Sequence, residues 1–130
     1  VDEKACEAEF EVAKKKIAAG ASFIITPPVF DITGGSALLA KVKELGVPVI
    51  QTVFLIKSLA IAQYIANSDP HSGITEDLIR RIRKSSNREQ EGIKIAGETI
   101  LALKDQTQGV LLQTLGWEHK LPEILDVAKL

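Results

Sequence analysis

The chain has 130 residues, of which 45 % are hydrophobic and 25 % charged, which is the composition of one globular domain and not of a disordered segment. Sixteen basic residues stand against seventeen acidic ones, and this near-neutral balance argues against a nucleic-acid binder. No stretch approaches the roughly 20 apolar residues of a membrane span, and no signal peptide opens the chain. We therefore expect a soluble, cytoplasmic protein without nucleic-acid or membrane partners.

The first element is predicted to be an amphipathic helix. Cys6, Phe10, Ala13 and Ile17 recur at helical spacing, and Gly20 suits the position just past the helix end. Cys6 is the single cysteine, so the chain forms no internal disulfide and no cysteine-based metal site. Its place on the apolar side of this helix indicates a packing role.

A short strand should follow over Ala21–Ile25 and stop at Thr26, because Pro27 and Pro28 cannot continue a central strand. A loop is then expected up to the Gly34-Gly35 pair.

The rest of the chain is predicted to alternate helices with strands. The expected elements are a helix marked by Leu38, Leu39, Val42 and Leu45, a strand from Val47 through Ile50 toward Phe54, a helix capped by Ser58, a helix starting at Thr75, a long helix with a capping box at Ser86 and Glu89, a strand over Val110–Leu112, and a closing helix with Pro122 as its first residue. The basic run Arg80–Lys84 is interpreted as the last turn of a helix, where cations suit the helix dipole.

This order predicts an α/β fold with parallel strands joined by helical crossovers and covered by helices on both faces. Three strands leave two open edges, whereas a (β/α)₈ barrel closes its sheet in roughly 250 residues. We therefore expect residues 1–130 to be a single α/β unit, strands six to eight of a TIM-type barrel. A small free-standing doubly wound domain is the alternative. The chain begins at Val1 and has no methionine, which indicates that it was cut from something longer.

In parallel α/β folds the ligand lies beyond the carboxyl ends of the strands. The candidate binding residues at those ends are mostly amide, hydroxyl and aromatic: Thr26, Pro27, Phe30, Asp31, Gln51, Lys57, Gln113, Thr114 and Trp117. Such a set suits a flat heteroaromatic ligand, which takes stacking on its faces and hydrogen bonds at its edge. The alternative is that the aromatic residues belong to the core and that Asp31 only organises a turn.

Other kinds of site are not supported. No glycine-rich phosphate fingerprint follows a strand, and no serine lies in a nucleophile elbow. His71 and His119 lack the spacing of metal ligands, and His119 is interpreted as a solvated loop residue.

Several segments resemble the methylenetetrahydrofolate reductase family. The stretch Ala18–Thr26 followed by Phe30-Asp31 is similar to that family's sixth strand, and Leu45–Ile50 resembles the helix and strand that come next. The segments Glu91–Glu98, Gly109-Val110 and Leu115–Glu118 are similar to the end of the bacterial members.

This resemblance implies a flavoprotein in which reduced FAD passes hydride to the methylene carbon of methylenetetrahydrofolate, giving the methyl form. NAD(P)H or an electron-donor protein would re-reduce the flavin. The region after Thr26, with Lys57 and Gln113–Trp117, would line the folate and flavin faces. Pro27 stands where the family carries a glutamine that hydrogen-bonds the pterin, and Gln51 is a candidate to supply the missing amide.

Two other functions remain open. The chain could be a non-catalytic, barrel-derived subunit that docks on a catalytic partner, or an unrelated enzyme on a similar barrel. In either case its open strand edges predict an oligomer or a longer chain.

Overall fold

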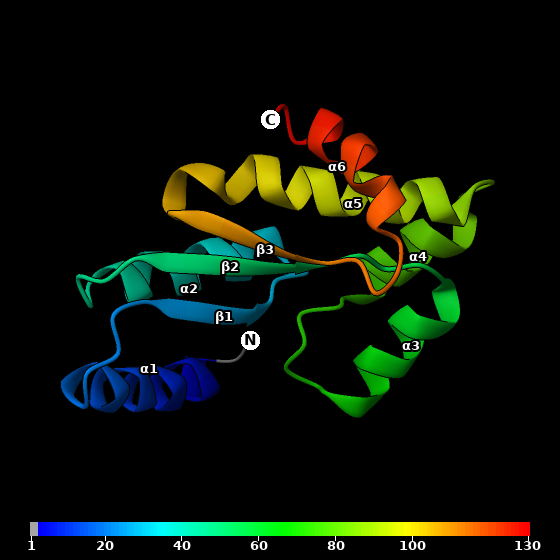
Figure 1. Cartoon of the computed structure of the whole chain (residues 1–130). Helices are drawn as coiled ribbons and strands as arrows, with labels where there is room; N and C mark the ends of the chain where they lie inside the picture. The colour runs from blue at the N-terminus through cyan, green and yellow to red at the C-terminus, as the bar shows by residue number, and fades with distance from the viewer. Residues whose placement is uncertain (1–2) are drawn as a thin grey trace.

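The computed structural model describes residues 3–130, except for the side chains of residues 3, 5 and 6. The order of elements confirms the predicted α-β-α-β-α-α-α-β-α pattern (Figure 1). The elements are α1 (Glu3–Ala18), β1 (Ile24–Pro28), α2 (Ile32–Lys43), β2 (Val49–Phe54), α3 (Leu59–Ser68), α4 (Glu76–Lys84), α5 (Arg88–Leu103), the 3₁₀ turn Lys104–Gln106, β3 (Gly109–Gln113), the 3₁₀ turn Glu118–Lys120, and α6 (Leu121–Val127). The expected packing role of Cys6 lies outside the described side chains.

The three strands form one parallel sheet in the order β1-β2-β3. Strand β2 is central, with Ile24 opposite Val49 on one side and Phe54 opposite Gln113 on the other. All three strands end toward the same edge, and α3 and α4 lie beyond that edge (Figure 1). None of the described helices is long and apolar enough to cross a bilayer.

One face of the sheet is packed under helices. On β2, Val49 lies in a buried cluster with residues of α2, and Val53 lies in a cluster with Ile93 and Ile100 of α5. The inward side of α5 is the predicted one, because Ile93, Ala96, Ile100 and Leu103 are all buried.

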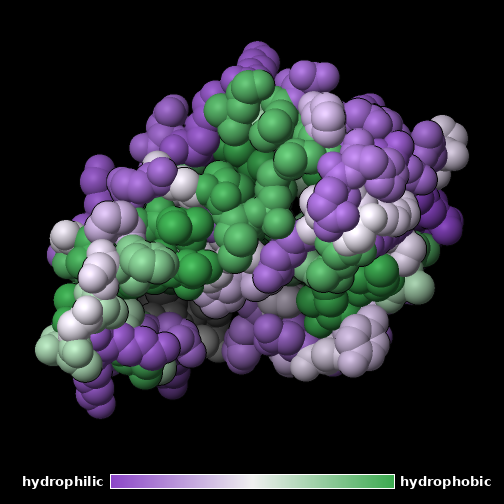
Figure 2. Space-filling view, viewed as in Figure 1, coloured by the Kyte–Doolittle hydropathy of each residue, from purple (hydrophilic) through white to green (hydrophobic). Residues whose placement is uncertain are grey.

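The opposite face of the sheet is partly open within residues 3–130, which differs from the expectation of helices on both faces. Successive side chains of a strand point to opposite faces, so Ile50 points away from α5. Its register partner on β1, Ile25, is 49 % exposed, and Leu111 of β3, which lies opposite Thr52, is 40 % exposed. Figure 2 shows hydrophobic surface gathered over the strands in this view. We call the side chains of Ile25, Ile50 and Leu111 the open face.

The prediction that the first strand stops before its prolines is wrong. Strand β1 includes both, and its register with β2 shifts between Ile25 and Pro28. The hydroxyl of Thr26 accepts a hydrogen bond from the Thr52 N–H (3.1 Å) and donates one to the Pro27 carbonyl (2.9 Å). This hydroxyl therefore bridges the irregular part of the ladder, and β1 tolerates prolines because it is an edge strand here.

The expected loop at Gly34-Gly35 is also wrong, since both glycines lie inside α2. Asp31 caps this helix by accepting from the N–H groups of Thr33 (3.2 Å) and Gly34 (3.0 Å). A Cβ at Gly35 would lie 2.4 Å from Val29 Cγ1, so the glycine allows α2 to approach the sheet closely.

The remaining helix starts follow local capping chemistry. Ser58 and Thr75 cap α3 and α4 as predicted. The predicted capping box of Ser86 and Glu89 is wrong, because Asn87 caps α5 by accepting from the Gln90 N–H (3.1 Å). Pro122 is the second residue of α6 rather than the first, still within the turn where its missing N–H costs nothing.

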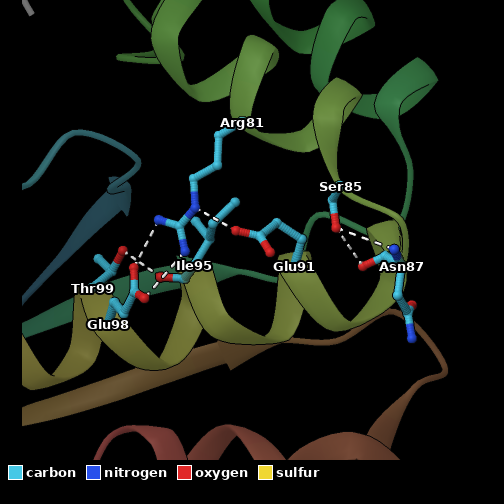
Figure 3. A network of polar contacts seen from close by, with 7 residues as sticks. All are labelled: Arg81, Ser85, Asn87, Glu91, Ile95, Glu98 and Thr99. Atoms are coloured by element: carbon cyan, nitrogen blue, oxygen red, sulfur yellow. Dashed lines mark hydrogen bonds and ion pairs between the residues drawn. The ribbon is translucent and has the colours of Figure 1, made fainter.

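The basic run ends α4 as expected, but Arg81 also joins α4 to α5 (Figure 3). Its guanidinium donates to both carboxylate oxygens of Glu98 (2.7 and 3.1 Å) and to Glu91. The hydrogen bonds to Glu98, and then those to Glu91, raise the pKa of Arg81 against the opposing effect of burial. Such a bidentate pair fixes geometry as well as energy, so Arg81 fastens the α3–α4 segment to the helix layer.

Arg81→Met should lower the free energy of unfolding by about 1 kcal/mol, because it removes a bidentate, partly shielded ion pair. The measurement is urea denaturation at low salt. Arg80→Met is the matched control, since Arg80 is exposed and its one ion pair among residues 3–130 is with Asp77 one turn away (3.1 Å). An equal effect of the two substitutions would contradict the assignment.

Candidate functional site

The candidate binding residues divide into three groups in space. Those that follow β1 lie at its outer edge. Gln51 lies inside the helix layer. Those that follow β2 and β3 meet at a turn beyond the end of β3.

At the β1 edge, Pro27, Phe30 and Asp31 line a cavity of about 430 Å³. Its other walls come from α1, α2 and the loop after α3: Glu9, Pro28, Val29, Gly34, Gly35, Leu38, Ile65, Asp69, His71, Ser72 and Gly73. The carboxylate of Asp31 caps α2. This agrees with the alternative interpretation of the sequence, in which Asp31 only organises a turn. Thr26 is buried and bridges β1 to β2, so its side chain has a structural task.

The side chains of Phe30 and Phe54, at the ends of β1 and β2, belong largely to the core. Phe30 is buried, and its ring meets that of Phe54 edge-on, with centroids 6.3 Å apart. Both belong to an apolar cluster with Ile56 and Ile82, which fastens α3 and α4 beyond the strand ends. This matches the alternative in which these aromatic residues serve packing.

Gln51 does not face the strand ends where a ligand is expected. It lies between Val49 and Val53 on β2, so its side chain points under the helices. The residue is 0 % exposed, and neither side-chain atom has a hydrogen-bond partner among the described residues. An amide buried in this way cannot reach a ligand on the open face.

Gln113 has the opposite orientation. Leu112 packs against the helix-layer cluster around Val53, so the next residue on the strand points away from the helices. Gln113 lies opposite Phe54 in the register and is half-buried. Its amide makes no hydrogen bond to any residue that the structure describes.

Lys57 and Trp117 are brought together by the turn after β3. The Lys57 ammonium donates to the Leu115 carbonyl and lies 5.1 Å from the centroid of the Trp117 ring. Trp117 also packs against the cluster around Val53 and Leu55, so its ring closes the end of the helix layer. An ammonium over an indole face is a favourable cation–π contact.

This turn holds an unusual backbone conformation. Leu115 and Gly116 have φ angles of +48° and +89°, and the Trp117 N–H donates to the Thr114 carbonyl (3.2 Å). Leu115 is a non-glycine residue in the left-handed region, which costs of order 1–2 kcal/mol. Such strain persists only where surrounding contacts hold it.

Glu118, which follows the predicted third strand but is not one of the candidate binding residues, supplies those contacts. One of its carboxylate oxygens accepts from the Thr114 hydroxyl (2.9 Å) and from the Gly116 N–H (3.0 Å). Its own backbone N–H, then these two donors, and finally the charge of Lys57 lower the pKa of Glu118.

The described residues contain no group of three or more potential metal ligands. The open face ends at the amide of Gln113, which has no hydrogen-bond partner among the described residues. The ammonium of Lys57 and the indole ring of Trp117 lie at the neighbouring turn.

Comparison with protein families gives a match over nearly the whole chain. The family model described as methylenetetrahydrofolate reductase covers residues 1–129. No curated protein matches the sequence closely enough to be compared.

Gln51→Met should raise the free energy of unfolding by about 1–3 kcal/mol, because it replaces a buried amide without partners by an apolar side chain of similar shape. Thermal and urea denaturation measure the change. Gln63→Met on α3 is the control, since the amide of Gln63 is only half-buried and the free-energy cost of burying it is smaller. A loss of stability in Gln51→Met would contradict the placement of this side chain.

Glu118→Gln should lower the melting temperature near pH 7, and the difference from wild type should shrink as the pH falls below the ordinary glutamate pKa. The pKa of Glu118 is lowered in the folded chain, so its stabilising effect is present above the ordinary glutamate pKa. That effect is lost as the pH falls through the lowered pKa. Melting curves of both proteins from about pH 7 to about pH 3 test this. Glu123→Gln, in the same segment but outside the turn, is the control, and a constant difference between wild type and Glu118→Gln would refute the prediction.

Proposed function

The chain belongs to the methylenetetrahydrofolate reductase family, a family of FAD-dependent oxidoreductases, and from that premise we propose that it forms one wall of a pterin-binding site. The whole enzyme would reduce methylenetetrahydrofolate, or a related pterin carrier, to its methyl form. This chain would supply strands six to eight of the barrel, with the remaining strands provided by a longer chain or a partner.

One observation carries the proposal: the open face leads directly to polar side chains at the carboxyl ends of its strands. Ile25 and Leu111 are exposed apolar side chains on the side away from the helices, and Ile50 on the same side is half-buried. Gln113 then ends β3 on the same side. A flat ring with polar edges needs an apolar floor beside a hydrogen-bonding rim.

The described residues do not fit the diphosphate of FAD. A phosphate group is commonly held by free N–H groups at a helix start. Here Asp31, Ser58, Thr75 and Asn87 already take N–H groups of the first turns of α2, α3, α4 and α5. Lys57 donates to a carbonyl, and Arg81 is held by two glutamates. The flavin would therefore depend on other parts of the barrel, and no hydride-transfer step is assigned to residues of this chain.

The tasks left to this chain are binding and the exclusion of water. The open face would cover one side of the pterin, while the Phe30–Phe54 cluster closes the region beneath α3. Lys57 follows β2, and its ammonium group lies against the turn after β3. This positive charge would attract the carboxylates of the folate tail. NAD(P)H or an electron-donor protein would reduce the flavin elsewhere in the assembly.

A second candidate is a non-catalytic subunit, and Pro27 is the observation that favours it. Proline cannot offer the side-chain amide that the family carries at this position, and the loss of one such hydrogen bond to a buried ring edge costs about 1–3 kcal/mol. Such a subunit would pair its open strand edges with a catalytic partner.

Titration of the chain with methyltetrahydrofolate, with FAD present, should quench the fluorescence of Trp117, the single tryptophan, in a saturable way. Lys57→Met should weaken binding about fivefold, the effect of about 1 kcal/mol between unit charges about 4 Å apart in water. Lys94→Met, an exposed lysine on α5, should leave the affinity unchanged. A folded chain that shows no saturable quenching would favour the non-catalytic subunit.

A further inference from the structure

We propose that Gln113 determines ligand specificity by forming hydrogen bonds to the edge of a pterin ring. Pro27 has no side-chain group that could form these bonds, and the Gln51 side chain points to the other face of the sheet. This inference rests on the proposed function, and it names the side chain by which the site would distinguish a pterin from another flat ring.

Only one of the two strand glutamines is available to a ligand. Gln51 is fully buried under the helices, with its neighbours Val49 and Val53 in apolar clusters. Gln113 is half-buried on the opposite side of the sheet. Because both strands are parallel and adjacent, this difference follows from which residue of each strand alternates toward α5.

Gln113 has a free amide in an apolar setting. Leu111 lies two residues earlier on the same face, and Phe54 lies opposite on β2, at the strand spacing of about 4.8 Å. The amide makes no hydrogen bond to a described residue. A half-buried polar group among apolar neighbours favours a ligand that satisfies it.

The amide is matched to the chemistry of a pterin. A glutamine side chain carries one acceptor oxygen and a donor NH₂ group next to each other. The pyrimidine edge of a pterin places donors and acceptors side by side, so the two can form a paired contact. The backbone beside Gln113 is fixed, because its carbonyl accepts from the Leu55 N–H (3.0 Å). The strand thus presents the amide at a defined place at the end of β3.

The test compares Gln113→Met with Gln51→Met in the 130-residue chain with FAD, by titration of Trp117 fluorescence with methyltetrahydrofolate. Gln113→Met should weaken binding about tenfold, which corresponds to about 1.4 kcal/mol, with no change in melting temperature. Gln51→Met should bind within twofold of wild type. Gln63→Met controls for the loss of an amide elsewhere.

A ligand variant makes the assignment specific. A 2-desamino analogue of methyltetrahydrofolate lacks part of the recognised edge, so it should bind wild type and Gln113→Met equally.

The outcomes separate this inference from the proposed function. Wild-type binding that Gln113→Met leaves within twofold would overturn the role of Gln113 and leave the pterin site standing. Loss of binding in Gln51→Met instead would assign the edge contact to Gln51. A folded wild-type chain that binds no ligand even when the rest of the barrel is supplied would overturn both.

Discussion

The alternation of side chains along β2 is the constraint on which the rest of the structure depends. Because β2 is central, each of its residues must point either under α5 or onto the open face. Val49 and Val53 point under the helices, and that fixes the faces of β1 and β3 through the ladder. A shift of one residue would exchange the two faces and bury every side chain now open.

The edges of the sheet show how side chains compensate for a backbone that cannot pair regularly. In β1 the Thr26 hydroxyl bridges to Thr52 beside two prolines. After β3, the carboxylate of Glu118 supports a turn in which Leu115 has a positive φ. In both places a side-chain oxygen accepts a hydrogen bond from a backbone N–H group where the regular ladder ends. The ends of the strands, where ligands bind in this class of fold, are thus held by side chains.

Two kinds of interaction hold the α3–α4 segment in place. The apolar cluster around Phe30 and Ile56 provides burial, which is strong but has no direction. The pair of Arg81 with Glu98 adds direction, because both guanidinium nitrogens must face the two carboxylate oxygens. Together they set how the segment lies over the strand ends.

The sequence by itself determined the order of elements, the parallel class of the sheet, the inward side of α5 and the family, because these follow from local periodicity, caps and motifs. It did not determine the extent of β1, the start of α2 or the roles of the two glutamines. Those depend on which strand lies at the edge, on how closely Gly35 lets α2 approach, and on which face of a strand the helices cover. Gln51 within β2 and Gln113 at the end of β3 have identical side chains, and only the side of the sheet on which the helices pack decides that one is buried and the other is half-buried.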